Sequence, residues 1–330
     1  MSKKHISKRN GIFLFCLAGL IMAAVIVFHH NPLADKQEEL VKKIIACLII
    51  VASCGVFTCF YDKITVLPVE LFQNRRLIWK LAKNDFKKRY AGSYMGIVWA
   101  MAQPVVTVVM YWLVFEKIFG NRSELLAGNL EVPYVLYLTA GLVPWFFFSE
   151  GIANGTSALL EYNYLVKKVV FKISILPIIK VIAAVFIHAF FLGVMLILAA
   201  TYGYFPTIYT IQLLYYSFCT FVFVLAISYT TCAVVVFFRD LQQIISIALQ
   251  IGMWATPIMW NISKAGEYQV LFKLNPMTYI VNGYRSAVFE KQWFFEDFYS
   301  TAYFWIVTVL LFGIGAIIFK RLKVHFADVL

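Results

Sequence analysis

The sequence NDFKKRYAGSYMGIVWAMAQP, from Asn84 to Pro104, joins a basic segment to an apolar one. Projecting residues 71–90 onto an α-helix separates the apolar side chains from the basic ones. The apolar face carries Leu71, Ile78, Leu81, Ala82, Phe86 and Tyr90, and the basic face carries Arg76, Lys80, Lys83 and Lys87. Such a helix is typical of a membrane surface, where its cations lie near anionic headgroups. Packing on protein would give the same pattern, but we favour the membrane because an apolar run follows at once.

The composition indicates a membrane protein. Of the 330 residues, 62% are hydrophobic and 14% are charged, whereas soluble domains contain about 25% charged residues. Eight apolar runs approach the length of about 20 residues that crosses a bilayer. They are residues 11–28, 44–61, 96–115, 133–149, 177–200, 208–238, 241–260 and 301–319. We predict an all-α polytopic membrane protein. The net charge of +12 does not indicate a nucleic-acid partner, because the cations lie between apolar runs.

The distribution of cations predicts an orientation. If the N-terminus is cytoplasmic, most of the 29 Lys and Arg residues lie on the cytoplasmic side, as the positive-inside rule requires. We therefore expect a multi-pass protein of the cytoplasmic (inner) membrane, with both termini in the cytoplasm and residues 261–300 outside. In that external segment, Asn275 and Pro276 form the pattern of a helix N-cap and first residue. We expect a short helix there that enters the outer leaflet through its apolar face.

The sequence contains few groups that could power transport or catalysis. Glu150, Asp240 and Glu290 are expected at span ends or in loops, which disfavours an ion-coupled carrier. No GxxxxGK[ST] sequence is present, so the chain has no P-loop for ATP. We assign no catalytic, metal-binding or cofactor-binding residue. The lone intramembrane histidine, His188, is expected to hydrogen-bond a neighbouring helix.

Two apolar runs carry stripes of uncharged polar and aromatic residues. The run 96–115 has Trp99, Gln103 and Thr107, and the run 241–260 has Gln243, Ser246, Gln250 and Trp254. Hydrogen-bonding groups beside aromatic rings suit a sugar chain, although contacts between helices explain the stripes better when they are taken alone. Tyr111 and Trp145 lie at span ends, where aromatic residues form an interfacial belt or line a path.

Five ordered stretches carry a resemblance to a known family. They are Asp85-Phe86 with Arg89, Tyr90, Ser93, Gly96, Trp99 and Pro104; GLVPWFFFSEGI (Gly141–Ile152); FFRDLQQI (Phe237–Ile244); TPIMW (Thr256–Trp260); and LNPMTYIVNGYR (Leu274–Arg285). Together they resemble the ABC transporter permeases that export polysaccharides such as O-antigen, capsule and teichoic acid. The resemblance covers about residues 70–330.

This resemblance implies a six-helix permease that forms a dimer and binds two copies of a separate ATPase subunit. The partner would hold ATP and Mg, and this chain would hold no cofactor. The loop Gly151–Leu176 would contact the ATPase through a coupling helix, although its lysines also fit an ordinary cytoplasmic loop. The predicted coupling residues are Glu161, Tyr162, Asn163, Tyr164, Lys167 and Lys168.

The expected organisation has three parts. Residues 1–62 form a transmembrane hairpin that the six-helix pattern lacks, residues 63–95 form the interfacial helix, and residues 96–330 form the permease core. The hairpin fits a peripheral anchor, a docking surface for a further subunit or an element of a lateral gate. The sequence does not choose among these roles.

The expected cargo is a lipid-linked polysaccharide, with membrane lipids around the complex. Its diphosphate headgroup would be recruited by Arg76, Lys80, Lys83, Lys87, Lys88 and Arg89. Binding of anionic lipid explains these cations equally well. The glycan would then pass Trp99, Gln103, Thr107, Tyr111, Trp145, Gln243, Ser246, Gln250 and Trp254. Alternatives are an ABC permease for a drug or a non-glycan lipid, a polytopic transferase and a structural scaffold.

Overall fold

The computed structural model describes residues 8–28, 40, 43–44, 47–48, 50–55, 57–58, 61, 65–89, 94–96, 98–120, 123–126, 130–167 and 172–330. The chain forms two compact units, Met1–Phe72 and Gln73–Leu330. The sequence placed its first boundary earlier, after residue 62.

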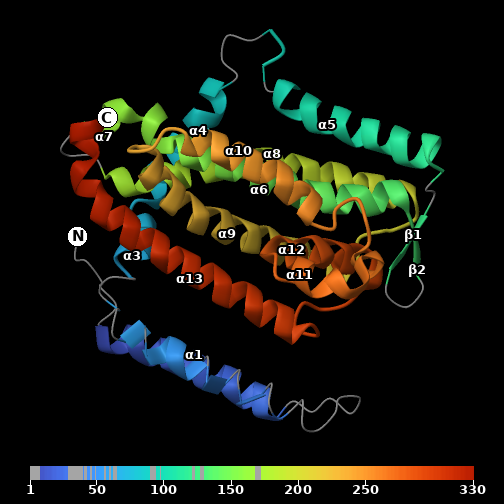
Figure 1. Ribbon diagram of the computed structural model, residues 1–330, viewed down its shortest axis with the longest axis horizontal. Coiled ribbons are helices and arrows are strands. Elements are labelled where there is room, and N and C mark those ends of the chain that lie inside the picture. Colours follow the sequence, from blue (N-terminus) through green and yellow to red (C-terminus); the bar gives the residue numbers. More distant parts are fainter. Residues whose placement is uncertain are drawn as a thin grey trace. The chain divides into compact units, whose positions relative to one another are not determined.

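Most of the described chain is helical (Figure 1). The α-helices are α1 (Lys8–Phe28), α3 (Val66–Gln73), α4 (Arg75–Arg89), α5 (Val98–Trp112), α6 (Tyr134–Glu161), α7 (Asn163–Val166), α8 (Leu176–Thr201), α9 (Gln212–Val235), α10 (Leu241–Ala255), α11 (Gln269–Lys273), α12 (Pro276–Arg285), α13 (Phe298–Leu322) and α14 (Phe326–Val329). The π-helical turns Leu113–Ile118 and Ser286–Glu290 follow α5 and α12. Short 3-10 turns cover Ile173–Ile175, Ile208–Ile211, Ile262–Tyr268 and Lys323–His325. Strands β1 (Ser123–Leu126) and β2 (Leu130–Pro133) pair antiparallel.

In the first unit, α1 packs against a second helical segment. Phe15 stacks on Phe57 with ring centroids 3.9 Å apart, and a Cβ on Gly19 would lie 3.0 Å from the Cys54 sulfur. The predicted span 44–61 falls on this segment. Its described residues are helical, and the remainder lies outside the described residues.

In the second unit, α6, α8, α9 and α13 form the core, and α9 contacts both α6 and α13 (Figure 1). Small residues allow this close packing. A Cβ on Gly155 of α6 would lie 2.2 Å from the Ser228 hydroxyl of α9, and one on Gly151 would lie 2.7 Å from Val224. The absence of side chains at these positions therefore sets the distance between α6 and α9.

The prediction of an all-α polytopic membrane protein is confirmed. Six helical segments among the described residues are long and apolar enough to cross a membrane. They are Lys8–Phe28, Val98–Ile118, Tyr134–Glu161, Ile173–Thr201, Ile208–Val235 and Phe298–His325, and each overlaps a predicted span.

Two predicted spans differ in length from their helices. The span expected to end at residue 149 continues as α6 to Glu161, so Glu150 lies inside a helix and not at its end. The charge is tolerated because Glu150 binds Arg89. The span expected to reach residue 260 stops at Ala255. Thr256 precedes Pro257 and is extended, with φ −103° and ψ 135°, as expected for a residue before proline.

The predicted surface helix is broken once and is amphipathic. A turn at Asn74 separates α3 from α4. Ile78 and Ala82 of α4 are buried, while Arg76, Lys80, Lys83 and Lys87 are exposed. The buried face packs on α8, where Phe186 contacts Trp79 and Phe86 with ring centroids 5.4 and 5.3 Å away. This part of the apolar face therefore meets protein and not the membrane surface.

The short helix predicted after Asn275 is confirmed as α12. The Asn275 side chain accepts a hydrogen bond from the Met277 amide at 3.0 Å, and Pro276 is the first helical residue. The apolar residues of this segment are buried, and α12 packs against α6 and α9. Protein therefore covers the apolar face of this segment, and the expected entry of that face into the outer leaflet is wrong. The buried residues are Met277, Ile280, Val281, Tyr284 and Val288.

His188 of α8 makes the contacts expected of it. Its Nε2 atom lies 2.9 Å from the Ser217 hydroxyl of α9 and 3.0 Å from the Tyr284 hydroxyl of α12. Ser217 and Tyr284 also contact each other at 2.7 Å. The histidine thus joins three helices.

The packing of α6 on α9 gives a first prediction. Gly155→Ala should lower the melting temperature of the purified protein by several degrees, because overpacking a close contact costs about 1–3 kcal/mol. The measurement is thermal unfolding in detergent followed by tryptophan fluorescence. Gly313→Ala on α13 is the control, because among the described residues no neighbouring element comes within 4 Å of a Cβ added there. Equal melting temperatures for the two variants would contradict the packing described.

Candidate functional site

A cluster of charged residues joins α4 to α6 and α8. The Lys180 ammonium of α8 lies 2.8 Å from Asp85 Oδ1 of α4 and 2.6 Å from Glu161 Oε2 at the end of α6. The Tyr162 hydroxyl donates a hydrogen bond to Asp85 Oδ1 at 2.5 Å. We call Asp85, Glu161, Tyr162 and Lys180 the lysine cluster.

The lysine cluster is largely shielded from solvent. The side chains of Lys180 and Asp85 are 5% and 8% exposed, whereas that of Glu161 is 49% exposed. A buried ammonium needs compensating partners, because removing a charge from water costs several kcal/mol. Burial and the hydrogen bond to Asp85 raise the pKa of Tyr162 above its ordinary value, so this phenol remains a hydrogen-bond donor. The cluster therefore requires all three helices to stay together.

A second ion pair lies along the same helices. Arg89, four residues after Asp85 on α4, binds Glu150 Oε1 of α6 at 2.6 Å and lies 3.6 Å from Asp85. Asn154, one turn further along α6, lies 3.4 Å from the same Glu150 oxygen. The last two turns of α4 are thus joined to α6 at two places, through Asp85 with Tyr162 and through Arg89 with Glu150.

The predicted coupling residues divide between this cluster and the surface. Glu161 and Tyr162 belong to the lysine cluster. Asn163, Tyr164 and Lys167 are exposed on or beside α7, and Lys168 lies outside the described residues. Any force applied to α7 would reach α4 through Glu161, Tyr162 and Asp85, since these residues are adjacent in the chain or in contact.

The cations predicted to recruit the headgroup fall into an exposed group and one half-buried residue. Arg76, Lys80, Lys83, Lys87 and Lys88 are exposed on α4. Arg89 is instead half-buried in its ion pairs with Glu150 and Asp85. The exposed five could contact an anion directly, whereas Arg89 already has carboxylate partners.

The predicted path residues lie on three helices. Gln243, Ser246, Gln250 and Trp254 are exposed along α10, none of whose residues is buried. On α5, Trp99 is exposed, Thr107 and Tyr111 are half-buried, and the Gln103 side chain lies outside the described residues. Trp145 of α6 is 4% exposed and packs on Gly252 of α10. The structure thus gathers the α10 residues on one uncovered face and places Trp145 behind that helix.

Sequence reasoning missed the lysine cluster as a unit. Asp85 follows Ile78 and Ala82 on the buried face of α4, and Lys180 lies within the apolar start of α8. A charged residue at a buried position rarely lacks a partner. That signal could have identified both residues, but the distance of 95 positions between them hides the pairing.

These helices and their buried ion pairs define a multi-pass helical membrane protein with a basic surface helix tied to its core. The chain matches the ABC-2 type transporter family over residues 76–289, and it belongs to that family. The match begins in α4 and ends just before Glu290. The predicted resemblance to ABC permeases is confirmed at this level, and the chain is a membrane transport permease.

Three relatives share one name. The O-antigen export system permease protein RfbA of Myxococcus xanthus is 28% identical over 262 residues, which cover 78% of this chain and 97% of that protein. Two proteins of Klebsiella pneumoniae with that name are each 25% identical over 259 residues, covering 77% of this chain and 95% of theirs. This chain therefore spans nearly the whole length of each relative and has additional residues.

The lysine cluster gives a second prediction. Lys180→Met should destabilise the docking of α4 strongly, because breaking a buried ion pair costs about 3–5 kcal/mol. Amide hydrogen exchange should then accelerate across Arg75–Arg89. Adding Asp85→Asn should restore part of the protection, because no buried carboxylate of α4 is then left without its ammonium.

Lys167→Met is the matched control for that experiment, because Lys167 is exposed. Its exchange should equal that of the unmodified chain. Unchanged exchange in Lys180→Met would show that the cluster does not hold α4.

Proposed function

We propose that this chain is the membrane subunit of an ATP-driven exporter that moves a lipid-linked polysaccharide out of the cytoplasm. The observation that carries the proposal is the family match over residues 76–289, together with relatives named as O-antigen export permeases along nearly their whole length. The cargo would be an O-antigen-like, capsule-like or teichoic-acid-like glycan on a lipid diphosphate.

The energy would come from two copies of a separate ATP-binding subunit. The sequence has no P-loop of its own. The exposed residues Asn163, Tyr164 and Lys167 on and beside α7 offer a contact surface for the partner. Movement of α7 would pass into α6 through Glu161 and into α4 through Asp85. This connection supports a coupling role for the end of α6.

The exporter would contain two copies of this chain. In one copy, neither α10 nor the apolar window of α5 has a fully buried residue within the described chain. Gln243, Ser246 and Gln250 on α10 are uncharged and hydrogen-bonding. A second copy facing α10 would enclose these side chains in a path for the glycan.

The exposed cations of α4 would recruit the diphosphate at the cytoplasmic leaflet. Clustered Lys and Arg side chains suit phosphate, which accepts charge-assisted hydrogen bonds. The buried face of α4 is occupied by α8, so the basic face remains directed outward. The proposed setting is the inner membrane, with both termini cytoplasmic by the positive-inside rule.

Disulfide trapping tests the two-copy arrangement. In a background with all native cysteines replaced, Ser246→Cys or Gln250→Cys should give a covalent dimer under mild oxidation in membranes. Ile314→Cys, at a position of α13 that is 51% exposed, should remain monomeric. A dimer from Ile314→Cys alone would place the interface on α13 and reject α10.

The cargo and the role of α4 are tested in lipid discs. The permease and its ATP-binding partner should hydrolyse ATP faster when an isoprenyl-diphosphate-linked glycan is added. Replacing Arg76, Lys80, Lys83 and Lys87 with Gln should remove this stimulation and abolish export in cells, because the headgroup loses its cations. Membrane insertion should be unchanged.

Lys320→Gln with Arg321→Gln is the control for that variant, because these exposed cations end α13. This control should keep both stimulation and export. Stimulation by a lipid without sugar, and none by the glycan lipid, would assign the chain to a different cargo. Normal export by the α4 variant would reject the recruitment role.

A further inference from the structure

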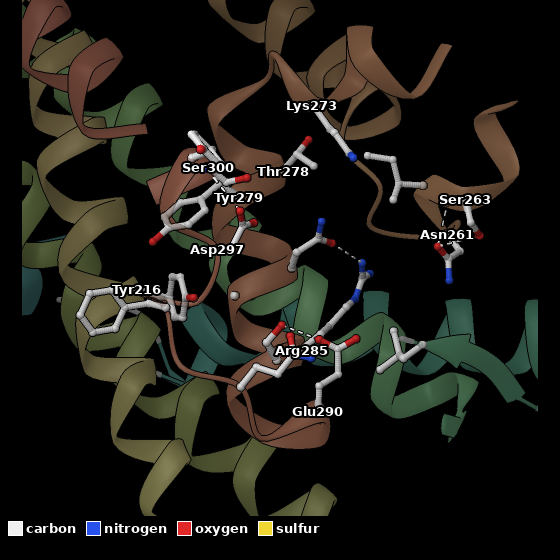
Figure 2. Close-up of a pocket in the computed structure, with 18 of the residues that line it drawn as sticks. Tyr216, Asn261, Ser263, Lys273, Thr278, Tyr279, Arg285, Glu290, Asp297 and Ser300 are labelled. Atoms are coloured by element: carbon white, nitrogen blue, oxygen red, sulfur yellow. Dashed lines mark hydrogen bonds between the residues drawn. The ribbon is translucent and has the colours of Figure 1, made fainter. Parts of the chain in front are cut away.

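A pocket of 860 Å³ lies beside α12 in the second unit (Figure 2). Its walls come from residues 261–274, residues 286–303, the tip of β1 and the ends of α6 and α9. This volume falls within the range of about 300–1,000 Å³ that is usual for small-molecule sites. The pocket lies in the segment that the cation distribution assigns to the outside, away from α7 and the basic face of α4.

Arg285 forms the rigid base of the pocket. It is 2% exposed, and its NH1 and NH2 groups donate to the Pro257 and Ile258 carbonyls, each at 2.7 Å. Its guanidinium lies 3.5 Å from the centre of the Tyr137 ring. Because its donors are directed to backbone carbonyls, Arg285 supports the pocket and is not available as an anion receptor.

The charges of the pocket disfavour a phosphate group. Glu290 and Asp297 contribute carboxylates to the lining, and Lys273 and Arg285 contribute the cations. In Figure 2, Glu290 lies beside Arg285, and Asp297 lies between Tyr279 and Tyr216. The two carboxylates offset the two cations, so the lining has no excess positive charge to attract a diphosphate. The lining therefore favours an uncharged ligand.

The remaining lining residues match the surface of a sugar. Asn282 and Gln292 contribute amides, which both donate and accept hydrogen bonds. The amide of Asn261 also lines the pocket, but it already donates to the Leu125 carbonyl and accepts from Ser263. Trp293 and Tyr299 contribute aromatic rings, whose faces are apolar. Sugar rings present hydroxyl groups at their edges and C–H groups on their faces. We propose that this pocket binds neutral sugar units of the exported glycan after they have crossed the membrane.

The inference rests on the proposed function and adds a place where the emerging glycan is held. The base is fixed by close packing of α12 on α9, since a Cβ on Gly283 would lie 2.1 Å from the Tyr216 ring. The rim is more accessible, with Tyr299 52% exposed. A glycan bound there would be hindered from sliding back while the transporter resets.

Photo-crosslinking in glycan-producing cells tests this site. A benzophenone amino acid is placed at Trp293 or Tyr299 in the pocket, or at Tyr268, which is 71% exposed and does not line the pocket. The purified permease is then blotted for the cells' own surface glycan. We expect glycan attached at positions 293 and 299 and not at 268.

A filling substitution supplies the second measurement. Asn282→Trp, combined with the crosslinker at 299, should reduce glycan attachment about tenfold, the change that about 1.4 kcal/mol produces. Glu267→Trp, exposed in the same segment but outside the pocket lining, should leave attachment unchanged. Attachment that persists in Asn282→Trp would overturn the assignment of the pocket.

The amount of surface glycan in the same cells distinguishes failure of the pocket inference from failure of the proposed export function. Normal surface glycan without attachment at 293 or 299 would overturn the pocket inference and leave the export function standing. Attachment of lipid instead of glycan at these positions would also overturn it. If cells lacking this chain display normal surface glycan, the proposed export function itself fails, and the pocket inference fails with it.

Discussion

The buried ammonium of Lys180 is the constraint on which the predicted cytoplasmic end of the permease depends. Taking an ammonium out of water costs several kcal/mol, and only close carboxylates offset that cost. Asp85 comes from α4 and Glu161 from the end of α6, so Lys180 on α8 holds its charge only while three helices meet. A surface helix that could otherwise lie free on the membrane is thereby made part of the core. Arg89 and Glu150 extend the same connection along α6.

Arg285 solves a similar problem by different means at the opposite end of α6. Its guanidinium is surrounded by backbone carbonyls and the Tyr137 ring. The Pro257 and Ile258 carbonyls are free to accept because α10 ends at Ala255, so they lie beyond its hydrogen-bonding pattern. The geometry therefore depends on an irregular backbone, which moves less readily than a side chain. Lys180 is bound by side-chain carboxylates, whereas Arg285 holds α12 against α6 through backbone carbonyls and the Tyr137 ring.

Apolar runs and helix-capping residues were enough to predict the long helices and α12, because burial in lipid or protein favours the same residues. Asn275 and Pro276 predicted the start of α12 from local chemistry alone. The error at Glu150 arose because a tertiary contact overrides local composition, whereas the early end of α10 follows from Pro257. Glu150 looked like the end of a span because its partner, Arg89, is 61 positions away. The resemblance likewise assigned Glu161 and Tyr162 to the coupling helix but could not show that they contact Lys180 and Asp85. Pairings between helices depend on packing, which periodicity does not encode.

The polar stripe on α10 favours the proposed arrangement of two copies of the chain. Gln243, Ser246 and Gln250 lie on an exposed face of a largely apolar helix, beside a further exposed amide, Gln242. Side-chain amides left without partners in hydrocarbon are costly, because no water is present to replace the lost hydrogen bonds. Lipid is therefore a poor neighbour for this face, while water or another polar protein surface is a good one. A second copy opposite α10 would supply both, by closing a wet path between two such stripes. The same argument does not apply to α13, whose exposed residues Val309, Leu310 and Ile314 are apolar and suit lipid directly.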